Sequence, residues 1–502
     1  MSERASPIRW SSYRNLVWVI PCVLLALLLR GVSIYQFAYP TGPDYGLHLL
    51  FAEQVLQTGA LPDYAENYQL GLATWPLLPG GPLIFGIAAA VSGESVFSVI
   101  HVVLFFAVVE VIGTSALAYQ VFRRTDAAAA AGAITAALPL LVDMMTWAGY
   151  PNLIAVSLFP ICFAVWLRYW QTPNARWLLV LTLLLCGMAS IHHLSTLWLV
   201  LTLGAFSVAH LLTAPRATLR RLIPLGIACA IVGLPIALDA IALTTQQDAA
   251  AVLTGSDRFD STRVTWEIFA RVITPMGLLL IAGVPLYLRS RQIDRASRLL
   301  IGALLLITLL FCFGWLFGLR FYYTRALYFL TLPIAFGGAS LIIAWKQRAL
   351  RWLTALVLIP AIAISGYVRA QTASAYFEIV TPDLIEAVTW LDEYSAPDDV
   401  IVTGTFFGFQ LTHLIDRPHL AALTPDLISN AEILPLAADA TAIMMGLDGM
   451  DSALLTHNVR FVVVRTRLPD IPDPDRSRRV MEAHPRLRLV FRNADALIYE
   501  VR

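Results

Sequence analysis

Two residues able to exchange a proton stand four positions apart in the first polar stretch of the chain, at Asp44 and His48. Gly42 and Pro43 end the preceding apolar run, and Gly59 is suited to cap the C-terminus of a helix. Between them apolar residues recur at helical spacing: Leu47, Leu50, Phe51 and Val55. The carboxylate and the imidazole therefore project from one face of a helix. We expect this helix to lie along a membrane interface rather than to cross it.

Two further polar clusters interrupt apolar runs. Asp143 ends one run and precedes a compact aromatic turn that contains Tyr150 and Asn152. His192 and His193 separate two other runs. Ionisable side chains at membrane depth are costly, so each cluster is a candidate functional site.

A third cluster carries two arginines, Arg320 and Arg325, with Tyr323 between them. Positive charge is disfavoured at the outer end of a membrane span, which is where the spans assigned below place this cluster. We expect Tyr323, together with Tyr150 and Asn152, to contact substrate.

Each of these residues also has a purely structural interpretation. Asp44 is also suited to cap its helix, Asp143 to bond its own turn, and the histidine pair to be satisfied at a tight turn. Arg320 and Arg325 are long enough to reach lipid headgroups. Within the apolar runs, two acidic residues are expected to pair with Arg30 or with neighbours: Glu110 and Asp239.

The composition predicts a polytopic membrane protein. The chain has 502 residues, of which 58% are hydrophobic and 14% charged. The apolar runs reach the ~20 residues that a bilayer requires, and we expect eleven spans, at about 15–38, 83–121 (with a break near 92–94), 127–145, 151–168, 177–191, 193–213, 222–243, 267–288, 298–318, 326–345 and 350–369. All five cysteines fall in these runs, so no disulfide framework is implied.

Arginine and lysine cluster at every second boundary between these spans, as around 4–14, 123–124, 216–221, 289–298 and 346–351. The positive-inside rule then places the N-terminus in the cytoplasm. The loop 39–82, the histidine pair and the tail are expected outside the cell membrane. From 371 onward the chain has 19 acidic and 11 basic residues, which does not suggest a nucleic-acid partner.

The composition becomes that of a soluble domain from about residue 371, so we divide the chain into a membrane domain (1–370) and an extracytoplasmic α/β domain (371–502). Thr381 and Pro382 predict a helix start. Four segments are typical of strands: 400–402, 461–464, 487–491 and 496–501, the last two as a hairpin. Thr424–Ile428 repeats the helix-start pattern of Thr381–Ile385.

The chain as a whole resembles the GT-C superfamily of polytopic glycosyltransferases, which includes oligosaccharyltransferases, protein O-mannosyltransferases and aminoarabinose transferases. The resemblance lies in one span, an acidic outer loop with Asp44 just after it, about a dozen spans and an outer α/β domain. The segments 147–152, 325–333 and 387–391 also resemble uncharacterised bacterial and archaeal members.

The resemblance implies transfer of a sugar from a polyprenyl-phosphate donor in the bilayer to a glycan, lipid or protein acceptor. Asp44 would be the general base of an inverting transfer, with His48 orienting it or binding the acceptor. Arg320 and Arg325 would bind the donor phosphate, with His192 and His193 as further phosphate ligands.

Many members of the superfamily carry two adjacent acidic residues in this loop, whereas here Tyr45 follows Asp44. Asp143 matches the second outer carboxylate of metal-using members by position. A Mg²⁺ or Mn²⁺ ion between Asp44 and Asp143 is therefore an expectation from the resemblance.

Two other functions stay open at this stage. In a transporter or flippase of lipid-linked sugars, four residues would line a path: Asp44, Glu110, Asp239 and Arg30. The chain shows no inverted hydropathy repeat, the usual sign of alternating access. In a non-catalytic envelope scaffold, the outer domain would bind a partner and Asp44 would be dispensable.

Overall fold

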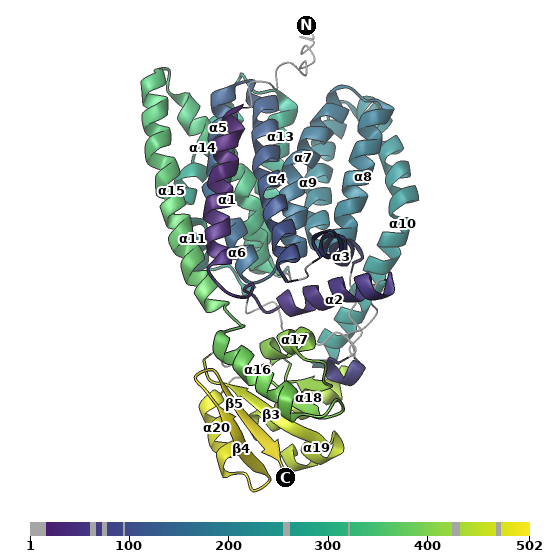
Figure 1. Cartoon of the computed structure of the whole chain (residues 1–502). Coiled ribbons are helices and arrows are strands. Elements are labelled where there is room, and N and C mark those ends of the chain that lie inside the picture. Colours follow the sequence, from purple (N-terminus) through teal and green to yellow (C-terminus); the bar gives the residue numbers. More distant parts are fainter. Residues whose placement is uncertain are drawn as a thin grey trace.

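A computed structural model describes residues 17–60, 67–72, 78–93, 96–254, 262–319, 322–423, 432–467 and 473–502. A bundle of long helices forms one part of the molecule, and a smaller α/β domain lies at one end of it (Figure 1). The first described residues of α1 lie toward the end of the bundle remote from the α/β domain, which we call the far end (Figure 1). The chain therefore traverses the bundle before it reaches the polar loop.

Each predicted span corresponds to a helix or a helix pair. The bundle consists of α1 (Val19–Tyr35), α3 (Gly80–Ser92), α4 (Val96–Phe122), α5 (Thr125–Ala137), α6 (Leu140–Thr146), α7 (Tyr150–Gln171), α8 (Ala175–Ile191), α9 (His193–Leu211), α10 (Pro215–Thr254), α11 (Trp266–Ile281), α12 (Val284–Arg289), α13 (Arg295–Cys312), η4 (Gly314–Phe317), η5 (Tyr323–Leu330), α14 (Thr331–Ala344) and α15 (Arg348–Tyr376). Among the described residues, eight helices are long and apolar enough to cross a membrane. The predicted break is present, because α3 ends at Gly93 in a left-handed conformation and α4 begins at Val96.

A buried ion pair joins two bundle helices. Arg30 Nη2 of α1 lies 3.4 Å from Glu110 Oε2 of α4, and both side chains are 1% exposed. Arg30 also donates to the carbonyls of Ala107 (2.5 Å) and Thr135 (2.9 Å). Paired and hydrogen-bonded charges are the form in which a membrane interior tolerates them. The structural pairing of Glu110 with Arg30 is therefore confirmed, while the side chain of Asp239 lies outside the described residues.

Helix α2 (Tyr45–Thr58) lies across the end of the bundle, between the bundle and the α/β domain (Figure 1). Gly59 ends it in the left-handed conformation, as predicted, with its N–H donating to the Val55 carbonyl. Leu47 and Phe51 pack into one cluster with Phe409 of the α/β domain. The polar loop is thus shared between both parts of the molecule.

The α/β domain contains a five-stranded sheet in the order β2-β1-β3-β5-β4. Its strands are β1 (Val400–Thr403), β2 (His419–Ala421), β3 (Val459–Arg465), β4 (Leu487–Arg492) and β5 (Ala496–Val501). Strands β2, β1 and β3 are parallel, and β3, β5 and β4 are antiparallel. The four predicted strands are present, and β2 is an addition to them. The pattern at Thr424–Ile428 lies outside the described residues.

Among the described residues of this domain, five helices pack around the sheet: α16 (Pro382–Tyr394), α17 (Thr405–Leu414), α18 (Ile433–Met445), α19 (Met450–Thr456) and α20 (Pro474–Ala483). The predicted helix start is confirmed, because Thr381 Oγ1 accepts a hydrogen bond from the Leu384 N–H (3.0 Å) and Pro382 takes the first helical position. α17 faces α2 across the domain boundary (Figure 1).

The polar loop also extends the sheet. Tyr68, beside η2 (Gln69–Gly71), forms a parallel bridge with His419 at the edge strand β2. The His419 N–H donates to the Asn67 carbonyl (2.9 Å), and Gln69 Nε2 donates to the Ala421 carbonyl (2.9 Å). A segment far away in sequence therefore covers an edge that would otherwise be unpaired.

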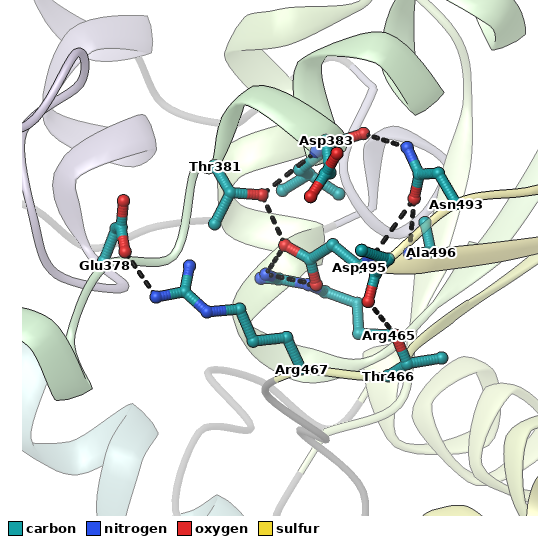
Figure 2. A network of polar contacts seen from close by, with 11 residues as sticks. Glu378, Thr381, Asp383, Arg465, Thr466, Arg467, Asn493, Asp495 and Ala496 are labelled. Atoms are coloured by element: carbon teal, nitrogen blue, oxygen red, sulfur yellow. Dashed lines mark hydrogen bonds and ion pairs between the residues drawn. The ribbon is translucent and has the colours of Figure 1, made fainter.

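A buried network fixes the connection between α15 and the sheet (Figure 2). Arg465 donates through Nε and Nη2 to the carboxylate of Asp495, and both side chains are 1% exposed. Thr381 Oγ1 donates to Asp495 Oδ2 (2.5 Å). Beside this buried network, Arg467 and Glu378 form a more exposed ion pair. The segment leaving the membrane helix is thereby bound to the end of β3 and to the hairpin.

Candidate active site

The loop before Asp44 fits tightly against the turn between α6 and α7. Gly42 has a φ of +105°, and a Cβ placed there would lie 2.5 Å from the backbone of Trp147 and Ala148. Only glycine meets both requirements. This contact brings the start of α2 beside the aromatic turn that the sequence singled out.

Asp44 occupies the N-cap position directly before α2, but its side chain does not cap the helix. Its backbone is in the right-handed helical region (φ −81°, ψ −5°), and its side chain makes no capping hydrogen bond. A residue whose side chain caps a helix normally has an extended backbone. The structure therefore does not support the interpretation of Asp44 as a helix cap. The carboxylate is half-buried, and its desolvation raises the pKa of Asp44 to about 6, although the charge of Arg325 acts in the opposite direction.

His48 lies one turn further along α2. Its Nε2 is 3.1 Å from the Ala148 carbonyl oxygen. A carbonyl only accepts, so Nε2 carries the proton and Nδ1 keeps a free electron pair in the neutral ring. Burial lowers the pKa of His48 to about 4, against the effect of this hydrogen bond. The ring also contacts Tyr150 and Phe85, with centroids 5.4 and 5.5 Å away.

Tyr150 and Asn152 both stand at the start of α7. The Tyr150 ring lies beside His48, and Asp44 acts on it electrostatically. Asn152 Oδ1 is 2.7 Å from Ser195 Oγ, which is 2.8 Å from His192 Nδ1. The amide nitrogen of Asn152 is buried without a hydrogen-bond partner in the described part of the chain.

His192 caps α9 through Nδ1, which accepts from the Ser195 N–H (3.1 Å). Nδ1 therefore has the hydrogen-bond partner that the structural interpretation of the histidine pair predicts at a tight turn. In the neutral ring Nε2 then carries the proton and is available as a donor. His193 stacks on His192 with ring centroids 5.6 Å apart.

Arg325 links these groups electrostatically. The guanidinium lies over the rings of Trp147 (5.4 Å) and Tyr322 (4.7 Å). Burial is the main cause that lowers the pKa of His192, and the charges of His193 and Arg325 act in the same direction. At Asp44 the charge of Arg325 opposes the effect of burial, so Arg325 lies within electrostatic range of both Asp44 and the histidine pair. Among the described residues it makes no side-chain ion pair. A half-buried arginine held between aromatic faces has donors free for an anion.

Asp143 takes part in a different network. Its Oδ1 accepts from Arg369 Nη2 of α15 (2.8 Å), and its Oδ2 accepts from the Tyr328 hydroxyl (3.0 Å). The Tyr328 oxygen in turn accepts from Trp147 Nε1 (2.9 Å). This network holds Trp147, and with it the aromatic support of Arg325, in place.

The residues present do not by themselves form a metal site. Within the described ranges, no group of three or more His, Cys, Asp or Glu side chains is placed to hold an ion. Both oxygens of Asp143 are already engaged by Arg369 and Tyr328. A shared ion between Asp44 and Asp143 stays a prediction, and no step below depends on it.

The structure does not bring every predicted residue to this cluster. The Tyr323 hydroxyl donates to the Leu319 carbonyl within its own segment. Arg320 lies outside the described residues. Their roles stay predictions.

Three residues near the site were not anticipated from the sequence: Ser195, Arg369 and Gln410. Arg369 carries the same signal as Arg325, a positive charge at the expected outer end of a span. Ser195 stands three residues after His192, the spacing of a capping partner. Gln410 donates to the carbonyls of Gly42 and Pro43 (both 2.9 Å), and no local pattern marks it.

Solved structures with the same fold were found for nearly the whole chain. ArnT from Cupriavidus metallidurans bound to undecaprenyl phosphate aligns with a TM-score of 0.61 at 13% identity, over 96% of this chain and 97% of that one. The oligosaccharyltransferase AglB from Archaeoglobus fulgidus, in complex with an inhibitory peptide and a dolichol-phosphate, aligns with a TM-score of 0.59 at 14% identity, over 91% and 70%.

The mycobacterial arabinofuranosyltransferase AftD aligns with a TM-score of 0.61 at 16% identity, over 99% of this chain and 42% of that one. No protein-family model and no curated protein sequence matches the chain. These likenesses concern the fold, and they confirm the architecture that the sequence resemblance predicted.

Proposed function

We propose, from the premise that the chain has the fold of the GT-C glycosyltransferases, that it is itself a membrane glycosyltransferase. It moves a sugar from a polyprenyl-phosphate donor to an acceptor at the end of the bundle where Asp44 lies. One observation carries the proposal. A half-buried carboxylate at the start of α2 makes no capping bond, has its pKa raised to about 6 by desolvation, and lies within electrostatic range of Arg325, which makes no ion pair in the described part of the chain.

In the proposed transfer Asp44 accepts the proton of the acceptor hydroxyl. The acceptor oxygen forms a bond to the anomeric carbon as the bond from that carbon to the phosphate oxygen breaks. A single displacement of this kind inverts the anomeric centre. The pKa of Asp44, near 6, keeps most of this carboxylate ionised at neutral pH and leaves it basic enough to take a proton.

Arg325 stabilises the departing polyprenyl phosphate. Negative charge grows on the leaving oxygen, and a fixed guanidinium in a partly desolvated site stabilises it more strongly than water does. The protonated Nε2 of His192 and the adjacent His193 supply further donors, with Arg320 as a fourth candidate. Tyr150, Asn152 and Tyr323 are the proposed substrate contacts.

The lipid-linked donor suits the architecture. Its chain stays in the bilayer beside the bundle while its phosphate and sugar reach the polar end. ArnT was solved with undecaprenyl phosphate and AglB with a dolichol-phosphate and a peptide, which supports a donor of this class and a separate acceptor. The acceptor is proposed as a glycan, lipid or protein on the outer face of the membrane.

The test is an assay of the purified full chain with a panel of polyprenyl-phosphate sugars, measuring free polyprenyl phosphate and sugar transfer. Wild type should turn over at least one donor, and Asp44→Asn should not. Transport of an intact lipid-linked sugar in liposomes, unaffected by Asp44→Asn and without sugar release, would contradict the proposal.

A further inference from the structure

A groove of about 390 Å³ opens between α1, α5 and α15 at the end of the bundle remote from α2. α1 and α15 touch at the other end, where the Ser374 hydroxyl donates to the Ser33 carbonyl (3.3 Å). Toward the far end the two helices enclose the groove instead. Ala129 and Ala133, one turn apart, line it on the side of α5. Their short side chains leave the space between the helices open.

The groove is apolar along its length and cationic at its end. Arg348 and Arg351 line it at the first turn of α15. Arg351 Nη1 lies 3.2 Å from Asp126 Oδ2, and the same carboxylate is bound by Arg124 at 2.6 and 2.9 Å. One carboxylate is therefore shared by two guanidinium groups, and Arg348 adds a third positive charge to the lining of the groove. Arg348 is exposed and makes no side-chain hydrogen bond or ion pair to the described part of the chain.

Two tryptophans mark where the groove meets its surroundings. Trp18 of the segment before α1 and Trp352 of α15 line it and are 57% and 50% exposed. Exposed tryptophans near the end of a membrane bundle are typical of the level of the lipid headgroups. The groove thus runs from headgroup level into the depth of the acyl chains.

We propose that this groove binds an anionic glycerophospholipid, with an acyl chain along Ala129 and Ala133 and its phosphate at Arg348 and Arg351. Basic pockets between membrane helices are the usual sites of such headgroups, and a guanidinium donates two parallel hydrogen bonds to a phosphate. A polyprenyl-phosphate donor fits less well, since its phosphate would lie at the end of the bundle opposite Asp44. That last comparison alone rests on the proposed function.

A second groove repeats the combination. It has a volume of about 440 Å³, lies between α9, α12 and α13, and is lined by Ala205, Ala209 and Gly302 together with Arg295 and Arg298. Two other grooves, at α1 and α4, are lined by no lysine or arginine. Of these four grooves, the two that are lined by several alanine or glycine residues also carry a pair of arginines, and both pairs lie at the end of the bundle remote from α2.

The experiment is native mass spectrometry of the purified, delipidated full chain with phosphatidylglycerol or phosphatidylcholine of identical acyl chains. Wild type should retain phosphatidylglycerol in preference. Arg348→Gln, at an exposed side chain without a hydrogen bond in the described part of the chain, should weaken that preference severalfold. The pair with Arg351→Gln should weaken it by about tenfold or more, because each cation near the surface adds to anionic lipid binding.

The matched control is Arg216→Gln with Arg220→Gln, which removes two exposed arginines from the start of α10 at the same end of the bundle but outside the groove. It should bind as wild type does. Ala133→Leu fills the groove without changing its charge and should remove one bound lipid of either kind.

Equal retention of both lipids, or an equal loss in the control, would overturn the proposal. Retention of one undecaprenyl phosphate in place of phosphatidylglycerol at this groove would also overturn it. A failed glycosyltransferase assay leaves the lipid measurement unaffected, so the two proposals fail separately.

Discussion

Asp44 differs from an ordinary helix-capping aspartate in what its loss should cost. Asparagine caps about as well as aspartate, and Asp44 makes no capping bond, so Asp44→Asn should fold normally. Loss of a general base lowers the rate by ~10²–10⁴-fold. We therefore expect turnover to fall at least about 100-fold with an unchanged or higher Tm. Asp473→Asn, at an aspartate that does cap its helix, α20, is the control and should keep wild-type turnover. Near-wild-type turnover of Asp44→Asn would reduce Asp44 to a structural residue.

The raised pKa of Asp44 has two consequences with pH. As a base it works only when ionised, so kcat/KM, which reports the free enzyme, should rise with pH through an inflection near 6. The folded state holds this proton more tightly than the unfolded state, so the stabilisation is present below pH 4 and lost as pH rises through about 6. Thermal unfolding should show Asp44→Asn gaining on wild type over that window. A pH-independent difference in Tm would contradict the assignment.

Arg325 distinguishes a phosphate ligand from a headgroup anchor. An anchor tolerates any cation, whereas a guanidinium held between Trp147 and Tyr322 presents a planar pair of donors that lysine lacks. Arg325→Lys should lose most turnover and Arg325→Gln more. Arg263→Lys, at an arginine that lies over the Trp315 ring, is the control. Wild-type kinetics for Arg325→Lys would move the phosphate site to the histidine pair.

Helix α17 has a role in placing the Asp44 loop, although it belongs to the other domain. Gln410 donates to the carbonyls of Gly42 and Pro43, and a Cβ at Gly46 would lie 2.3 Å from the Phe409 carbonyl oxygen. Gln410→Leu removes both donors but keeps the packing volume. We expect kcat to fall about 10-fold or more, since small displacements of a base are costly.

The control for Gln410→Leu is Thr412→Val in the same helix, whose hydroxyl bonds only the local Phe409 carbonyl. It should leave turnover within about twofold, because the lost bond is local to α17 and does not reach the Asp44 loop. A positioning role predicts that Gln410→Leu lowers kcat while the KM for the donor stays unchanged. A parallel fall in Tm and in the amount of folded protein for both variants would indicate a structural role only.

Features that rest on neighbouring residues were predictable, and those that rest on distant pairs were not. The break at Gly93, the helix start at Thr381 and the hairpin β4–β5 each follow from the residues at that place. The pairing of Asp143 with Arg369 joins residues 226 positions apart. The contact of Gln410 with Gly42 and the Tyr68–His419 bridge also join residues far apart in sequence, so only the fold reveals them.

The two proposed sites of the molecule lie at its opposite ends, and they do not follow the division into two domains. Within the polar loop, α2 packs on both the bundle and the α/β domain, and the segment 67–72 extends the sheet of the α/β domain. The candidate active site lies where bundle, loop and α/β domain meet, whereas the grooves with arginine pairs lie at the other end. Chemistry and anionic lipid binding are therefore proposed on opposite faces of one membrane.

The sidedness of these two ends is the last prediction. The basic boundaries predict that the far end faces the cytoplasm and the α/β domain faces outward. Single cysteines at the exposed residues Asp398 and Arg216 report the two ends, and the five native cysteines lie buried or half-buried, so background labelling should be low. In intact cells a membrane-impermeant maleimide should label Asp398→Cys at once and Arg216→Cys only after permeabilisation. The reverse order would place Asp44 in the cytoplasm, where an acceptor on the outer face is out of its reach, and the proposed reaction would have to be abandoned.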